Sequence, residues 1–123
     1  MKSLLGNTRR PEISFFTSGR IDISASIAKH LCLKSGDVID ILYDEKSGEC
    51  YLYVKVRQPN GHHTGSVYRT NLHGNNYRTF TKKLTTAILQ LCNTNNTARL
   101  AVGTPIINEQ YGTMLPLITR LLL

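Results

Sequence analysis

The stretch "SGRIDISASIAKHLCLKSGDVIDILYDE", residues 18–45, decides the fold expected for this chain. Apolar and polar residues alternate over residues 20–23, which predicts a strand with one buried face. Ser24 then stands at a helix N-cap position, and apolar residues follow it at helical spacing. Gly36 suits the reversal after this helix, because glycine adopts a positive φ without strain. The pattern indicates a strand, a short helix, a tight turn and a second strand.

Further strands are expected on both sides of this stretch. The segment "ISFF" within residues 12–16 supplies the β-branched and aromatic residues that are typical of a strand. Residues 38–56, "VIDILYDEKSGECYLYVKV", have the pattern of a hairpin with "DEKSG" in its turn. Residues 12–56 are therefore interpreted as one strand–helix–hairpin unit.

The same order of elements returns in residues 79–120. A strand ends near Phe80, Thr81 is an N-cap candidate, and a helix with an apolar face follows, marked by Leu84, Ala87, Ile88 and Leu91. The segments "ARLAV" and "TMLPLIT" are then predicted strands on either side of a turn at "NEQYG". We interpret residues 79–120 as a degenerate repeat of the first unit, and residues 57–78, rich in Gly, Asn and His, as a basic arm between the two halves. The 123 residues are expected to form a single domain.

The first unit contains Gly19-Arg20, Ile21, Ile23, the pair Ile27 and Leu31, and the turn Leu33-Lys34-Ser35-Gly36-Asp37. Through these residues it resembles the AbrB-like swapped-hairpin DNA-binding domain family. The resemblance implies a barrel of two interleaved copies with basic residues laid against DNA, Arg20 and Lys34 among them. The expected fold is therefore mainly β with two short helices, a swapped-hairpin barrel in which one chain supplies both halves as a pseudo-dimer.

Charge is distributed unevenly along the chain, which carries a net charge of +7. Residues 1–49 hold seven basic and seven acidic side chains, whereas no acidic residue occurs from Cys50 to Asn108. Such asymmetry favours DNA or another polyanion as partner. The predicted phosphate contacts of this segment are Arg57, Arg69, Arg78, Lys82 and Lys83. Tyr68 and Tyr77 either stack on bases or pack against the barrel.

Lysines at the start of a helix oppose its dipole, which favours a role for Lys82 and Lys83 other than stability. The leading hypothesis is a small DNA-binding transcriptional regulator. The alternative is a structural or assembly protein, for example a component of a phage particle or of another mobile element, in which the barrel meets protein subunits and an acidic surface satisfies the same charges. A homo-oligomer fits both hypotheses.

The sequence contains no motif that indicates an enzyme, a metal site or a membrane span. No nucleophile elbow, paired catalytic carboxylates or phosphate-binding glycine loop is present, so we expect no enzyme and no cofactor. His62, His63 and His73 do not have the spacing of metal ligands, so no metal site is expected. No apolar stretch is long enough to cross a membrane, and the expected location is the cytoplasm, or a virion under the alternative hypothesis.

Two expectations concern packing. The odd number of cysteines argues against a disulfide framework, and Cys32 and Cys92 are expected to pack as small hydrophobic residues at helix ends. Both halves are expected to contribute to one shared core, with the following members: Ile23, Ile27, Leu31, Ile39, Ile41, Leu52, Val54, Leu84, Ile88, Leu100, Val102, Leu115 and Leu117.

Overall fold

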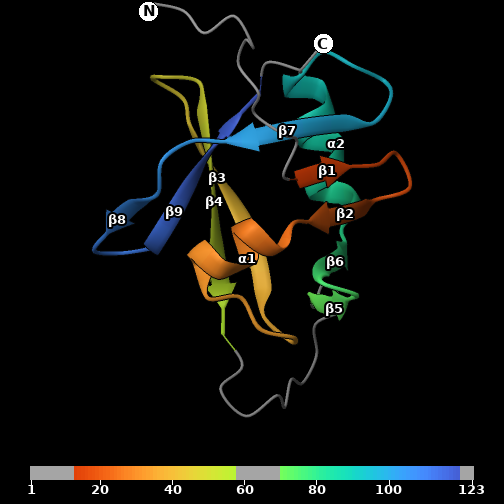
Figure 1. The fold of residues 1–123 in the computed structure, drawn as a ribbon. Helices are drawn as coiled ribbons and strands as arrows, with labels where there is room; N and C mark the ends of the chain where they lie inside the picture. The colour runs from red at the N-terminus through yellow and green to blue at the C-terminus, as the bar shows by residue number, and fades with distance from the viewer. Residues whose placement is uncertain (1–12, 58–69, 120–123) are drawn as a thin grey trace, which may run out of the picture.

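The computed structural model describes residues 13–57 and 70–119 and is mainly β with two short helices, as predicted (Figure 1). The elements in chain order are β1 (Ile13–Phe15), β2 (Arg20–Ile23), α1 (Ala25–Leu31), β3 (Val38–Asp44), β4 (Glu49–Val56), β5 (Asn71–His73), β6 (Asn76–Phe80), α2 (Lys82–Leu91), β7 (Ala98–Val102), β8 (Ile106–Asn108) and β9 (Gly112–Ile118). The β5–β6 hairpin begins inside the range that the sequence assigns to the arm. Most of that arm lies outside the described residues.

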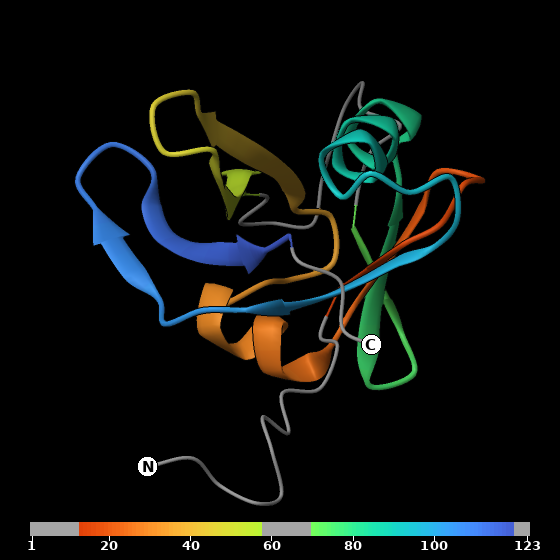
Figure 2. The same cartoon turned by 90° about the horizontal axis from the view of Figure 1, so that it is seen from above.

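The strands form one curled antiparallel sheet in the order β3-β4-β9-β7-β1-β2-β6-β5, with β8 paired to β9 beside this path. Figure 2 shows the β3–β4 and β8–β9 hairpins on one side and β1, β2, β6 and α2 on the other, with β7 running between them. Thr70, just before β5, contacts the residues just before β3, so it connects the two strands at the ends of this order. Its carbonyl accepts from the Gly36 N–H at 2.8 Å, and its own N–H donates to the Asp37 carbonyl at 2.7 Å. These two hydrogen bonds therefore join the two end strands of the half-barrel.

Both helices begin at the N-caps that the sequence predicts. The Ser24 hydroxyl accepts from the Ile27 N–H at 3.3 Å, and the Thr81 hydroxyl accepts from the Leu84 N–H at 3.5 Å. Each cap satisfies a backbone donor that has no partner within its own helix. Gly36 has a φ of 96°, which confirms the positive φ expected for the turn after α1.

The β1–β2 turn contacts the start of α2, and the first residue of β6 contacts the start of α1. The Gly19 carbonyl accepts from the Thr81 N–H at 2.9 Å and from the Thr85 hydroxyl at 3.4 Å. In the other direction, the Asn76 side-chain oxygen accepts from the Ala25 N–H at 3.1 Å. The spacing along the chain from Gly19 to Asn76 equals the spacing from Ser24 to Thr81. Gly19 and Asn76 are thus placed alike against opposite helices.

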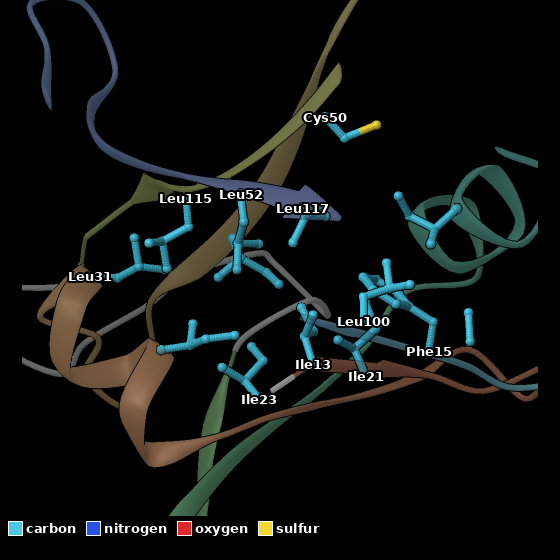
Figure 3. Close-up of a cluster of buried hydrophobic side chains, with 14 of the residues drawn as sticks. Ile13, Phe15, Ile21, Ile23, Leu31, Cys50, Leu52, Leu100, Leu115 and Leu117 are labelled. Carbon is cyan, nitrogen blue, oxygen red and sulfur yellow. The ribbon is translucent and has the colours of Figure 1, made fainter. Parts of the chain in front are cut away.

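One hydrophobic cluster contains or directly contacts every residue expected in the core, so Leu31 of α1 and Ile88 of α2 share the same interior. Figure 3 shows side chains from α1 and from strands of both halves pointing toward one another. The strands β1, β2 and β7 supply alternate residues to this cluster: Ile13, Phe15, Ile21, Ile23, Ala98 and Leu100. Because side chains alternate across a strand, the residues between these point to the opposite face of the sheet.

Two packing predictions are wrong. The buried residues of α2 are Thr85, Ile88 and Leu89, whereas Ala87 and Leu91 of the predicted face are exposed. Thr85 can be buried because its hydroxyl donates to the Gly19 carbonyl, so α2 buries a polar residue that apolar spacing alone does not predict.

The second wrong prediction is the packing of Cys32, which is exposed. This residue ends α1 in the left-handed conformation, with a φ of 52°, between the buried Leu31 and Leu33. Cys92 is partly buried and packs against the core, as expected. All three cysteines are free thiols.

Candidate nucleic-acid interface

The outward face of β7, β1, β2 and β6 carries a row of polar side chains that crosses the four strands. The strand registers pair Arg99 with Ser14, Ser14 with Asp22, and Asp22 with Arg78. Directly opposed residues on neighbouring antiparallel strands project from the same face of a sheet. The register therefore brings two arginines from the acid-free segment to the outside of the first half's β1–β2 hairpin.

A second row lies two residues along the same strands and is aromatic. Arg20 of β2 is directly opposite Phe80 of β6, and the Phe16 N–H donates to the Arg20 carbonyl at 2.9 Å on the other side. Phe80 is 54% exposed. We call these two rows together the arginine face, defined by Phe16, Arg20, Asp22, Arg78, Phe80 and Arg99.

Interactions within the arginine face hold its cations in place. The Arg78 Nε donates to Asp22 Oδ1 at 2.8 Å, and the Arg20 Nε lies 3.5 Å from the same oxygen. The Arg20 guanidinium carbon is 3.9 Å from the centre of the Phe16 ring, and that of Arg99 is 5.8 Å from it, both within the range of a cation–π interaction. Each guanidinium has five N–H donors, so the three arginines together have many more donors than the two oxygens of Asp22 can accept. The face can therefore donate to an anionic ligand while its arginines remain ordered.

The predicted site residues separate into different regions of the surface. Arg20 and Arg78 lie together on the arginine face. Lys82 lies against the β1–β2 turn just before Arg20, because a Cβ built on Gly19 would be 3.1 Å from the Lys82 Cγ. Lys83 instead lines a separate cleft that also includes Lys55 and Asp40.

Lys34 and Arg57 lie near the C-terminus of α1, around the Asp37 carboxylate. The Arg57 guanidinium donates to the carbonyl oxygens of Leu31 at 2.7 Å and Cys32 at 2.9 Å, and it lies 3.7 Å from the buried Asp37 carboxylate. The Lys34 N–H donates to the same carboxylate. This position gives Arg57 a structural role as a cap of α1. Arg69 lies outside the described residues.

Sequence reasoning missed four members of the arginine face: Phe16, Asp22, Phe80 and Arg99. All four lie in or beside predicted strands, at positions that alternate with buried residues. That alternation could have predicted that these side chains point outward. Only the pairing register of the strands shows that they lie together on one surface. Tyr77 packs against the hydrophobic cluster, and Tyr68 lies outside the described residues.

A groove of about 500 Å³ lies away from the arginine face, between the β3–β4 and β8–β9 hairpins. Its lining includes Leu42, Tyr43, Tyr51, Tyr111 and Met114, with Asp44 and Glu45 beside them. A hydrogen bond from the Tyr51 hydroxyl to Glu49, at 2.5 Å, is the main cause that raises the Tyr51 pKa above its usual value. The phenol therefore stays protonated over a wider pH range than usual.

Two other features are absent from the described part of the chain. No group of three or more His, Cys, Asp or Glu residues there is arranged to hold a metal ion. None of the helices described is long and apolar enough to span a membrane. Comparisons of the chain with protein-family models, with curated proteins and with solved structures find no match. Function is therefore argued from the geometry of the arginine face.

Proposed function

We propose that this chain is a nucleic-acid-binding protein and that the arginine face is its binding surface. The observation that carries the proposal is a group of three arginines on the outward side of four adjacent strands, where Arg20 and Arg78 pair with the single carboxylate of Asp22 and Arg99 lies near the Phe16 ring. Guanidinium groups bind phosphate through paired hydrogen bonds, and each neutralised phosphate releases counterions and adds affinity. Lys82, against the turn just before Arg20, extends the positive surface toward the start of α2.

The fold that accompanies this function is a single-chain, swapped-hairpin pseudo-dimer of the AbrB-like kind. Three features support it: equally spaced N-caps, hairpin residues that contact the opposite helix, and one core shared by both halves. In such a fold β2 and β6 are equivalent strands, and their direct pairing forms the centre of the arginine face. A small DNA-binding regulator is the activity that this resemblance implies.

The test is the replacement of Arg99 by Ala, measured as nucleic-acid affinity by fluorescence anisotropy over a salt series. Arg99 is exposed and makes no ion pair that the structure gives, so the fold should tolerate the change. We expect weaker binding and a salt dependence that is flatter by roughly 0.9 in log–log slope for each duplex phosphate that is no longer neutralised. Lys46→Ala is the matched control, since it removes one exposed charge from the β3–β4 turn, remote in sequence and strand order from the face.

The two lysines of α2 provide a second comparison. Lys82 lies against the turn just before Arg20 and Lys83 lines a different cleft, so Lys82→Ala should weaken binding more than Lys83→Ala. Equal affinity and equal salt slope for the parent, Arg99→Ala and Lys82→Ala would refute the proposal for this face.

A second candidate function, a structural component of an assembly, is favoured by a different observation. Ile106 and Ile107 of β8 are 41% and 78% exposed on a short strand whose pairing, within residues 13–57 and 70–119, is with β9. Exposed apolar side chains on an edge strand invite pairing with another chain. Light scattering should then report an oligomer that Ile107→Lys converts to a smaller species, and a parent that is monomeric without nucleic acid would contradict this candidate.

A further inference from the structure

The exposed aromatic ring on the arginine face indicates which kind of nucleic acid this surface fits. Phe80 follows the buried Thr79 in β6 and leaves more than half of its surface in contact with water. A single exposed Phe is unremarkable by itself, but this one is directly opposite Arg20, whose guanidinium already covers the Phe16 ring. The result is a row of flat groups, two phenyl rings with a guanidinium between them, across adjacent strands.

The polar row supplies charge at a fixed distance from the aromatic row. Arg99, Asp22 and Arg78 stand two residues along the strands from the aromatic row, a separation of roughly 6.5 Å at the usual rise of a strand. Neighbouring strands lie about 4.8 Å apart, so both rows cross the sheet in parallel. A nucleic-acid strand that crosses β7, β1, β2 and β6 can therefore place its bases on one row and its phosphates on the other.

We infer that the arginine face binds unpaired nucleic acid in preference to duplex, with Phe80 stacked on a base. The inference rests on the proposed function and specifies its ligand. A phenyl ring has no donor or acceptor with which to read the edge of a base pair, and the faces of paired bases are covered by their neighbours. An unpaired base exposes its face, and stacking on an aromatic ring is the common way in which proteins hold it.

The chain contains no tryptophan, which allows a direct test. Phe80→Trp introduces a single indole at the proposed stacking position, and a base stacked on it should quench its fluorescence. We expect quenching with an oligonucleotide of about 16 nucleotides without self-complementarity, and none with the blunt duplex of the same sequence. Ile107→Trp, on the exposed β8, is the matched control and should report no quenching with either ligand.

Affinity measurements complete the test. Phe80→Ala should weaken binding of the unpaired oligonucleotide by roughly 5- to 150-fold, the usual range for one stacked base, and leave duplex binding nearly unchanged. Ile107→Ala should change neither. Circular dichroism confirms that each variant is folded before it is compared.

The outcomes separate this inference from the proposed function. If Arg99→Ala weakens binding while Phe80→Ala does not and Phe80→Trp is not quenched, the face binds nucleic acid without stacking and the inference is overturned. Tighter binding of the duplex than of its unpaired strand by the parent protein overturns it as well. If neither Arg99→Ala nor Phe80→Ala affects any ligand, the proposed function itself fails.

Discussion

Replacement of Arg57 by Ala should destabilise the protein, although its sequence context suggested a phosphate contact. Two guanidinium nitrogens donate to the last carbonyls of α1, at 2.7 and 2.9 Å, and the group also faces the buried Asp37 at 3.7 Å. Hydrogen bonds to a charged group contribute about 1.5–3 kcal/mol each, and a cation at a helix C-terminus adds several tenths. The Arg57 side chain is 51% exposed, so water offsets much of this sum. We expect the free energy of unfolding to fall by about 2 kcal/mol.

Urea denaturation followed by circular dichroism measures this change. The midpoint should fall by roughly 1 M with an unchanged slope, as expected for a loss of stability without a change in exposed surface. Arg57→Lys should be destabilised about half as much, because an ammonium group cannot donate to two carbonyls in the fixed geometry of a guanidinium. Lys55→Ala is the control, since its pair with Asp40 is 3.8 Å long and exposed, and should cost less than about 0.5 kcal/mol. Equal midpoints for Arg57→Ala and Lys55→Ala would refute this account of the α1 cap.

Three other parts of the fold carry predictions of their own. Gly19→Ala should destabilise the protein by more than about 1 kcal/mol in urea denaturation, because φ is 98° and the new Cβ would approach α2; Gly48→Ala, at φ 74° with open space around it, should cost less. Asp22→Asn should raise nucleic-acid affinity roughly two- to fivefold in the anisotropy assay, because it removes the carboxylate that opposes phosphate, and lower affinity would contradict the arginine face. Burial raises the pKa of the Cys50 thiol, so less thiolate forms at about pH 8 and a colorimetric thiol reagent should modify the exposed Cys32 first; equal rates would contradict the packing of Cys50.

Much of the fold could be predicted because its signals are local. The N-caps at Ser24 and Thr81 depend on a hydroxyl placed just before a helix, and the turn at Gly36 depends on a residue without a Cβ. The core could be predicted for a similar reason, since apolar residues at strand and helix spacing have few alternative positions. These signals fix which face of each strand is buried, and therefore also which residues point outward.

The rest depends on contacts between distant parts of the chain. The buried face of α2 includes Thr85 because the Gly19 carbonyl accepts its hydroxyl, and no periodicity of apolar residues contains that information. Arg57 caps a helix that ends 25 residues earlier at Cys32, so its sequence neighbours give no sign of this role. In both cases a polar side chain donates to a backbone carbonyl of a distant segment, a contact that neither residue type nor apolar spacing predicts.

The charge pattern selected Arg and Lys residues as candidate contacts but grouped them by sequence. The acid-free segment from Cys50 to Asn108 distributes its cations over the arginine face, the cleft at Lys83 and the cap of α1. Only strand register brings Arg78 and Arg99 to the same surface as Arg20, which belongs to the half of the chain with balanced charge. The same register places Asp22 among these arginines. Its carboxylate pairs with Arg20 and Arg78, which orders their side chains and lowers the net positive charge of the arginine face. Under the proposed binding mode, flat groups as well as charge contribute to affinity, which is why the replacement of Phe80 is expected to distinguish the ligands best.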